Sequence, residues 1–307
     1  MKAIRLNAFG GPEMLKVEEV PVPEPAEGEI LVRIHGASIN PVDHKIRSGN
    51  YPRVQPDKLP LTPGRDVSGT VERCGPGVAI WEPGVAVYAV LPEDRGGYAE
   101  FVAVPAKDCA AKPEATDHVR AAAVPLAGLT AWQGLFDHGG LQEGQHVLIH
   151  GAAGGVGHLA VQFARARGAT VSATCSPCDL EFVRGLGAGQ VVDYKNQRFE
   201  ELVHEVDLVF DLVGGETQDR SWSVLKEGGM IVSTLMPPSK EKAKRRGRGT
   251  NYMVQPSGSQ LADIARLVDA AKVTPTIERT FTLAEAAEAQ RRLENGSVRG
   301  KLVLQVL

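Results

Sequence analysis

The sequence predicts an α/β protein that combines a β-rich domain with a doubly wound parallel sheet. Three observations predict this architecture. In the first third of the chain, short apolar runs are densely punctuated by proline and glycine, as in a compact barrel-like domain. After Ala121, apolar strands alternate with helical segments, which is the βαβ pattern of a parallel sheet. One of the later strands runs directly into a glycine-rich turn that precedes a helix.

The strands of the first part are expected where short apolar or β-branched runs fall between turn residues. The runs that meet this description are residues 30–34, 67–71, 85–89 and 99–104.

The second part begins with a helix within residues 121–136, after Pro125. Strands are expected at 146–150, 170–174, 191–194, 206–211 and 230–234, with helices at 158–167, 179–186 and around 217–225. Helices over 260–271 and 283–294 and strands over 276–280 and 301–307 finish the chain. We expect the last strand to return to the first domain.

The glycine-rich turn lies in residues 146–157 (HVLIHGAAGGVG). Apolar residues recur on one face of the following helix, which Gly168 ends as a C-cap. The first N–H groups of a helix have no partner within it, and together with the helix dipole they attract a phosphate anion. A merely tight turn is the alternative, but the flanking strand and helix favour a site for the pyrophosphate of a dinucleotide.

Size and composition exclude several classes of protein. With 307 residues the chain is long enough for two domains, and its net charge of -3 gives no argument for nucleic acid as a partner. No apolar run reaches the length of a membrane span, and the amino terminus has no signal-peptide core. We therefore expect a soluble protein of the cytoplasm.

The four cysteines are too few and too scattered for a disulfide framework. Cys175 and Cys178 form a C-x-x-C pair, which is compatible with a redox pair or with half of a zinc site. No second pair completes such a site, and ordinary packing at a strand end is the favoured interpretation.

Residues 240–248 (KEKAKRRGR) form a strongly basic cluster. A solvated or mobile surface loop near the cofactor is the favoured interpretation, and a nucleic-acid contact is the alternative.

The nucleotide is predicted from the residue about 20 positions beyond the glycines, where NAD enzymes usually carry Asp or Glu. Ser176, 19 residues after Gly157, occupies this position and offers a hydroxyl to a 2′-phosphate, which favours NADPH. Asp179 lies close by and counts against NADPH. Ser176 is also a candidate helix N-cap, followed by Pro177 and with Asp179 at the third helical position, as in a capping box.

The motifs together resemble the zinc-independent quinone oxidoreductase branch of the medium-chain dehydrogenase/reductases, and closest of all the NADPH-dependent alkenal/enone reductases. The resemblance covers nearly the whole chain. Its markers are residues 37–45 (ASINPVDHK), 61–69 (LTPGRDVSG), 97–101 (GYAEF), 125–131 (PLAGLTA), 151–157 and 299–304 (RGKLVL).

The resemblance implies a GroES-like catalytic domain over residues 1–124, completed by 272–307, and a Rossmann NADPH-binding domain over 125–271. It also implies a site without metal. Zinc-dependent relatives carry a cysteine ligand near Asn40 and a His–Glu pair where this chain has Arg65 and Asp66. A guanidinium stays protonated and cannot bind zinc.

The resemblance also assigns individual residues. Those implied to bind the cofactor are Lys45, Thr130, Gly154, Gly155, Val156, Gly157, Ser176, Tyr194 and Arg299. Relatives often carry lysine at the position of Asp179, and Lys195 or Arg248 could substitute for it. Asn40, Tyr51 and Lys45 are implied on the catalytic and substrate side. The residues alone leave alternatives open: Tyr51 could be an aromatic lid on a turn, Asn40 could bond the backbone, and Lys45 could be solvated.

The activity expected from the resemblance is hydride transfer from NADPH to an α,β-unsaturated carbonyl, as an enone or enal, or to a quinone, without zinc. A quinone-only reductase and a non-catalytic NADPH-binding protein of structural or RNA-associated role are the alternatives. A homodimer is expected by analogy with the family.

Overall fold

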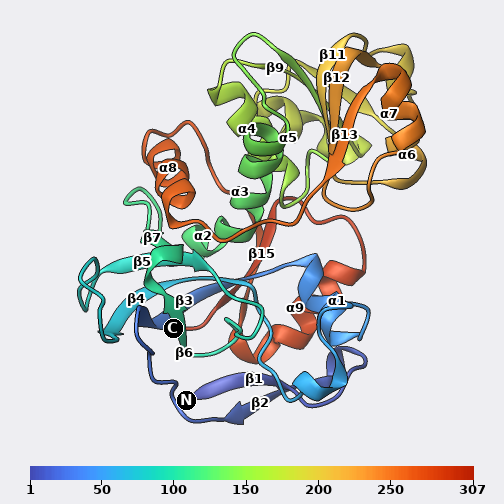
Figure 1. The fold of residues 1–307 in the computed structure, drawn as a ribbon. Coiled ribbons are helices and arrows are strands. Elements are labelled where there is room, and N and C mark those ends of the chain that lie inside the picture. The colour runs from blue at the N-terminus through green and yellow to red at the C-terminus, as the bar shows by residue number, and fades with distance from the viewer. The chain divides into compact units, whose positions relative to one another are not determined.

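The computed structural model describes all 307 residues, Met1–Leu307, and the chain forms two compact units (Figure 1). Unit 1 comprises Met1–Leu126, Pro256–Ala270 and Pro275–Leu307, and unit 2 comprises Ala127–Gln255 and Ala271–Thr274. None of the helices combines the length and the apolar character that a membrane span requires.

Unit 1 is built on a seven-stranded sheet whose central strand is β3 (Glu29–Ile39). The strands lie in the order β14-β15-β3-β4-β5-β7, and β6 also pairs with β3. Their bounds are β4 (Asp66–Cys74), β5 (Ala86–Val90), β6 (Phe101–Pro105), β7 (Cys109–Ala111), β14 (Ile277–Thr282) and β15 (Lys301–Gln305). The β-rich character predicted for the first part of the chain is therefore confirmed.

Strand β15 pairs antiparallel with β3, so the predicted return of the chain to its first domain is confirmed. Leu302 lies opposite Ile39 and Gln305 lies opposite Gly36. This pairing explains why β3 is longer than the predicted run of residues 30–34. Its last residues are held in the sheet by a strand that comes from the other end of the sequence.

A small antiparallel pair, β1 (Lys2–Leu6) and β2 (Leu15–Glu19), was not predicted. Strand β2 carries charged residues and buries only Leu15. The N–H of Ile4 in β1 donates to the carbonyl of Tyr98, and the N–H of Leu6 donates to the carbonyl of Leu61. These partners are distant in the sequence, so the local pattern alone does not reveal the strand.

The helices of unit 1 are α1 (Pro41–Arg47), α2 (His118–Ala122), α8 (Gly258–Asp269) and α9 (Ala286–Glu294). The sequence-based division assigned α8 to the nucleotide-binding part, whereas the contacts group it with unit 1. Gly258 packs so closely that an added Cβ would lie 2.4 Å from the carbonyl oxygen of Cys109. The Tyr88 hydroxyl also donates to the carbonyl of Leu261 at 2.6 Å.

Unit 2 contains a six-stranded sheet of entirely parallel strands, in the order β10-β9-β8-β11-β12-β13. The bounds are β8 (His146–His150), β9 (Thr170–Cys175), β10 (Gln190–Asp193), β11 (Val206–Asp211), β12 (Leu225–Ser233) and β13 (Gly247–Asn251). The connecting helices are α4 (Gly157–Ala166), α5 (Leu180–Gly185), α6 (Gly215–Ser221) and α7 (Lys240–Arg246). This is the strand order of a Rossmann sheet, so the predicted doubly wound fold is confirmed.

The helix expected within residues 121–136 is divided. Helix α2 ends at Ala122, α3 (Pro125–Trp132) begins at Pro125, and a π-helical segment continues over Gln133–His138. Proline lacks an N–H and is favoured in the first turn of a helix, which explains why a new helix begins there.

The basic cluster at residues 240–248 is not a loop, and this interpretation was wrong. Residues Lys240–Arg246 form helix α7, with Ser239 as an N-cap whose hydroxyl accepts the N–H of Lys242. Arg248 lies in β13, which adds a parallel edge strand to β12. The charges are solvated on the helix, while the backbone groups of β13 are paired in the sheet.

Candidate active site

The order of the strands in unit 2 reverses between β8 and β11. Strands β9 and β10 extend the sheet on one side of β8, and β11, β12 and β13 extend it on the other. In open parallel sheets, ligands bind outside the carboxyl ends of the strands at such a reversal. The glycine-rich turn follows β8 at this point.

The glycine turn contains two positions, Gly151 and Gly157, at which a side chain would be strained or would clash. Gly151 has φ +71, in the left-handed region that favours glycine. A Cβ on Gly157, the first residue of α4, would lie only 2.2 Å from the carbonyl oxygen of Gly151. Gly154, Gly155 and Val156 lie between them. The N–H of His158 already donates to the carbonyl of Gly154 at 3.0 Å, so the N–H groups that no backbone carbonyl accepts are those of Gly155, Val156 and Gly157. The turn therefore fits the pyrophosphate of a nicotinamide dinucleotide.

A second loop at the carboxyl edge is organised by Asp211, which the sequence analysis did not single out. Its Oδ1 accepts the N–H groups of Val213 and Gly214 at 3.0 and 2.8 Å. Its Oδ2 accepts the Gln218 amide and the Ser233 hydroxyl at 2.9 and 3.0 Å. An acidic residue at the end of an apolar strand was the available sequence signal.

Exposed apolar side chains follow the carboxyl ends of several strands of unit 2, from one edge of the sheet to the other. They are Tyr194 after β10, Val213 after β11, Leu235 and Met236 after β12, and Met253 after β13. Val213, Leu235 and Met236 follow the neighbouring strands β11 and β12, and exposed apolar groups on adjacent strands commonly mark a ligand-binding surface. This carboxyl edge therefore offers apolar surface as well as an anion site.

His150, the last residue of β8, is fully buried beneath the glycine turn. Its two ring nitrogens lie 3.0 Å from the Thr174 hydroxyl and 2.9 Å from the Ser221 hydroxyl. Burial lowers the pKa of this imidazole to about 4, so it is neutral at pH 7. It links β8 with β9 and α6 and is a structural histidine.

Ser176 follows β9 but does not cap the next helix with its side chain, so the predicted capping box was wrong in this respect. Its hydroxyl instead donates to Oδ2 of Asp179 at 2.5 Å, and it lies 3.1 Å from the Cys178 sulfur. Both Ser176 and Asp179 are buried. A carboxylate thus lies directly beside the hydroxyl predicted to meet the adenosine ribose.

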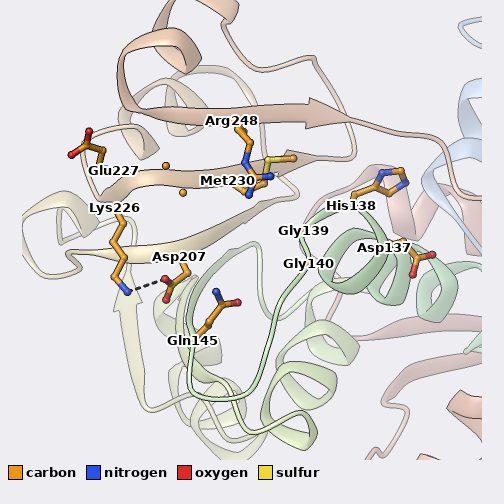
Figure 2. A pocket seen from close by; sticks show the side chains of 12 residues that line it. Asp137, His138, Gly139, Gly140, Gln145, Asp207, Lys226, Glu227, Met230 and Arg248 are labelled. Atoms are coloured by element: carbon orange, nitrogen blue, oxygen red, sulfur yellow. Dashed lines mark hydrogen bonds and ion pairs between the residues drawn. The ribbon is translucent and has the colours of Figure 1, made fainter.

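The structure separates the two basic residues considered as substitutes for a lysine at position 179. Lys195 follows β10 at the carboxyl edge and is exposed. Arg248 lies near the start of β13, in a cavity of about 350 Å³ at the amino ends of the strands, beside Met230 (Figure 2). Lys226 and Asp207 form an ion pair at 2.8 Å in the same cavity. Arg248 is therefore at the wrong edge of the sheet for this role.

Thr130 lies on α3, and its carbonyl accepts a hydrogen bond from the Tyr252 hydroxyl. The Tyr252 ring stacks on His138 with 4.4 Å between ring centroids. Gly134 fits against Tyr252, because an added Cβ would lie 2.6 Å from its hydroxyl oxygen. These contacts join α3 and the π-helical segment to the chain that follows β13.

In unit 1, Asn40 belongs to a buried polar network at the end of β3. Its amide donates to Oδ1 of Asp66 at 3.1 Å and, at 3.3 Å, to the carbonyl and the hydroxyl of Ser38. Its Oδ1 accepts from the ammonium of Lys301 at 2.6 Å. The donors of Asn40 are thus committed inside unit 1. For Asn40 to act on the substrate side by donating to a substrate oxygen, one of these bonds would have to break.

The buried carboxyl groups of Asp43 and Asp66 in this network have pKa values above their usual range. Burial raises the pKa of Asp43 to about 7, although the Asn40 N–H and the Tyr98 hydroxyl both donate to it. Burial also raises the pKa of Asp66, and the charge of Lys301 opposes this shift. The N–H of Leu126, in the first turn of α3, donates to Asp66. The network therefore joins β3, β15 and the start of α3.

Tyr51 lies outside this network and is half-buried. Its hydroxyl donates to Oε1 of Glu93 at 3.0 Å, which Arg53 also contacts at 3.1 Å. Burial and the neighbouring carboxylate raise the pKa of Tyr51. Lys45, on α1, and Arg299, before β15, are exposed, so both side chains are accessible to a ligand.

The residues at the position of a catalytic zinc do not form a zinc-binding set. The oxygen of Asn40 accepts from Lys301, Arg65 offers only N–H donors, and Asp66 already accepts three hydrogen bonds. Zinc sites in proteins use several thiolate, imidazole or carboxylate ligands. No group of three or more such side chains suited to a metal ion is found in the chain.

Family models match both parts of the chain. The model described as an alcohol dehydrogenase GroES-like domain matches residues 26–114, and the model described as a zinc-binding dehydrogenase matches residues 186–304. The human mitochondrial protein named NAD(P)H oxidoreductase RTN4IP1 is 36% identical over 91% of this chain and 82% of its own length. The chain belongs to the quinone oxidoreductase and alkenal/enone reductase branch of the medium-chain dehydrogenase/reductase superfamily.

Other members of this family are equally similar. The Arabidopsis thaliana protein named NADPH-dependent alkenal/one oxidoreductase, chloroplastic, is 35% identical over 99% of this chain and 79% of its own length. Among solved structures, the quinone oxidoreductase from Coxiella burnetii is 37% identical, with a TM-score of 0.93 over 100% of this chain and 99% of that one. This medium-chain reductase is therefore an oxidoreductase, with homologues that use NAD(P)H.

Proposed function

We propose that this medium-chain reductase transfers hydride from NADPH to an α,β-unsaturated carbonyl compound or a quinone, without zinc. The observation that carries the proposal is the glycine turn of unit 2, where the backbone around Gly157 has no space for a side chain. This turn belongs to a chain whose relatives are named as alkenal/one and quinone oxidoreductases.

The cofactor, when bound, supplies a hydride and thereby two electrons. In this proposal the first turn of α4 binds the pyrophosphate, and the side chains beyond β10, β11 and β12 pack on the apolar parts of the dinucleotide. Asp211 holds the loop after β11 in a fixed position, so the surface is formed before the ligand arrives. Unit 1 supplies the residues that meet the acceptor.

NADPH is the proposed donor, because Ser176 stands where an acidic residue would select NAD and because the Arabidopsis relative is named for NADPH. The carboxylate of Asp179 opposes this preference, since it lies beside Ser176 and would repel a 2′-phosphate. Lys195 is the basic residue that remains available at this edge. We therefore expect a modest preference for NADPH over NADH.

Without zinc, the negative charge that develops on the acceptor oxygen must be met by hydrogen-bond donors. Lys45 is a candidate donor, because its side chain is exposed in unit 1. Tyr51 is a second candidate, although its hydroxyl would have to leave Glu93 to donate to the acceptor. Asn40 acts in this proposal by holding the loop at the start of α1, since its own donors are used. Water is the proposed source of the final proton.

The proposal is tested by steady-state turnover of the purified chain with a short enone and with a benzoquinone, using NADPH and NADH in parallel. We expect oxidation of NADPH with both acceptors and unchanged rates after treatment with a strong zinc chelator. Turnover of the quinone alone would favour the quinone-only alternative. Tight NADPH binding without turnover of any acceptor would contradict the enzymatic proposal and favour a non-catalytic role.

A further inference from the structure

Unit 1 contains a second feature that the proposed function does not use, a cavity of about 250 Å³ that we call the Arg65 cavity. Ile46, Val54 and Leu61 form apolar parts of its lining, and Arg65, Glu93 and Arg95 form polar parts. Small-molecule sites commonly combine apolar walls with a few placed polar groups. The volume is small for such sites, so the cavity fits a compact ligand.

Arg65 is the least exposed arginine of this cavity, and most of its donors are unused. Its side chain is only 13% exposed. Of the five N–H donors of a guanidinium, one makes a hydrogen bond, from Nη2 to the carbonyl of Leu91 at 3.0 Å. Its Nε is buried without a partner. A permanently charged group with unused donors is suited to bind an oxygen that gains negative charge.

The nearest carboxylate does not occupy these donors. Glu93 lies 3.9 Å from Nη1 of Arg65, beyond hydrogen-bond distance, and its Oε1 instead accepts from Tyr51 and Arg53. The lining of the cavity carries more positive than negative side chains, with Arg53, Lys58, Arg65 and Arg95 against Glu93 and Asp94. It therefore suits an acceptor whose oxygen becomes negative during the reaction.

We propose that the Arg65 cavity binds the carbonyl end of a small conjugated carbonyl acceptor and that Arg65 is a catalytic residue which donates to its oxygen. This inference rests on the proposed function and names its substrate subsite. Hydride adds to the β-carbon, the carbon–carbon double bond breaks, and its electron pair moves to give an enolate whose oxygen faces the guanidinium. A proton from water then adds to the α-carbon, so that the acceptor is reduced and NADPH is oxidised to NADP⁺.

The guanidinium contributes to catalysis because it meets charge that is absent in the bound substrate. Such stabilisation lowers the barrier more than it tightens substrate binding, so its loss reduces kcat rather than raising KM. Loss of one donor of this kind typically costs about 100-fold or more in kcat. The restricted volume also predicts faster turnover of short enones and enals than of bulky quinones.

The experiment compares Arg65→Gln, Arg65→Lys and the wild-type chain with a short enone, together with NADPH titrations and thermal unfolding of each variant. Arg33→Gln is the matched control, because Arg33 also pairs with a glutamate, Glu72, but lies exposed on the sheet. We expect Arg65→Gln to lose about 100-fold in kcat, with an unchanged Kd for NADPH. Arg65→Lys keeps the positive charge and serves as the second test if Arg65→Gln does not fold. Its kcat is expected to lie between the values of Arg65→Gln and the wild type.

The result that overturns the inference is an Arg65→Gln variant whose kcat stays within a few-fold of the control while the wild type is active. In that case the proposed function stands and the role of Arg65 does not. A wild-type chain that binds NADPH but turns over no acceptor would overturn both.

Discussion

The ammonium of Lys301 donates to Oδ1 of Asn40 at 2.6 Å, which joins the start of the last strand to the end of β3. Lys301 also donates to the carbonyl of Ile39 at 3.1 Å, and it is almost completely buried. Its positive charge lies near the buried carboxyl of Asp66. The C-terminal strand thus completes the polar network on which the loop before α1 rests.

Replacement of Lys301 by methionine is expected to destabilise the protein by about 2–4 kcal/mol, because the buried oxygens of Asn40 and Ile39 would lose their donor. The nearby buried carboxyl of Asp66 would also lose a cation. The measurement is the free energy of unfolding in urea. Adding Asp66→Asn to Lys301→Met should recover part of the loss, since the uncompensated charge is then removed as well. Equal losses in the single and double variants would show that the charge of Lys301 does not compensate Asp66.

Replacement of Gly157 by alanine is expected to weaken NADPH binding about tenfold or more, because the new Cβ would meet the Gly151 carbonyl and displace the turn. A fluorescence titration with NADPH measures the effect. The matched control is Gly185→Ala at the end of α5, where a Cβ meets no atom within 4 Å. An unchanged Kd in the Gly157 variant would argue against this turn as the pyrophosphate site.

Replacement of Asp179 by asparagine is expected to increase the preference for NADPH about fivefold, because it removes a negative charge beside Ser176. The Kd for NADH should change little, since NADH lacks the 2′-phosphate. Measuring both dissociation constants at low and high salt checks the electrostatic origin, which requires the gain to shrink with salt. If the two constants change in parallel, the adenosine ribose does not lie at Ser176.

The buried, neutral imidazole of His150 leads us to expect a loss of stability in mild acid. Its folded pKa of about 4 lies below the usual value of 6.5, so between these values the unfolded chain binds more protons than the folded one. Its contribution is therefore complete above about pH 6.5 and is lost as the pH falls, by about 3 kcal/mol near pH 4. The difference in unfolding free energy between wild type and His150→Gln should shrink from pH 7 to pH 4. A difference independent of pH would contradict this assignment.

His118 is expected to lower the stability of the protein in acid, as His150 does. Its pKa is lowered to about 4, chiefly by burial, and its ring stacks on His35 with 4.3 Å between centroids. A cation on either ring would repel a cation on the other. Comparison of His118→Asn with wild type should therefore show a convergence of stabilities in the same acidic range.

Much of the fold was predictable because the relevant patterns are local. The run that ends at His150, the glycines after it and the apolar face of α4 lie within one short segment, so strand, turn and helix follow from it. Helix α7 was missed because its residues are almost all charged and carry no apolar face. Strand β13 was missed because its exposed residues carry no strand pattern, and only its pairing with β12 makes it a strand.

The candidate site was predictable only in part, for a similar reason. The positions of Gly157 and Ser176 follow from spacing along one βαβ unit. The amide of Asn40 donates to Asp66, and its oxygen accepts from Lys301 at the other end of the chain, so no local pattern could reveal that both groups are already bonded. Arg65 was noted only as unable to bind zinc, because its cavity is formed by separate segments.

The sequence by itself determined the doubly wound sheet, the dinucleotide turn and the branch of the family, because hydrophobic period, glycine spacing and motif order are properties of contiguous residues. The tertiary structure alone decided which polar groups remain free to act. It commits Asn40 to Asp66 and Lys301, ties Ser176 to Asp179, and leaves donors of Arg65 unused. The physical reason is that a hydrogen bond depends on distance and direction in space, which a residue type specifies only as a possibility.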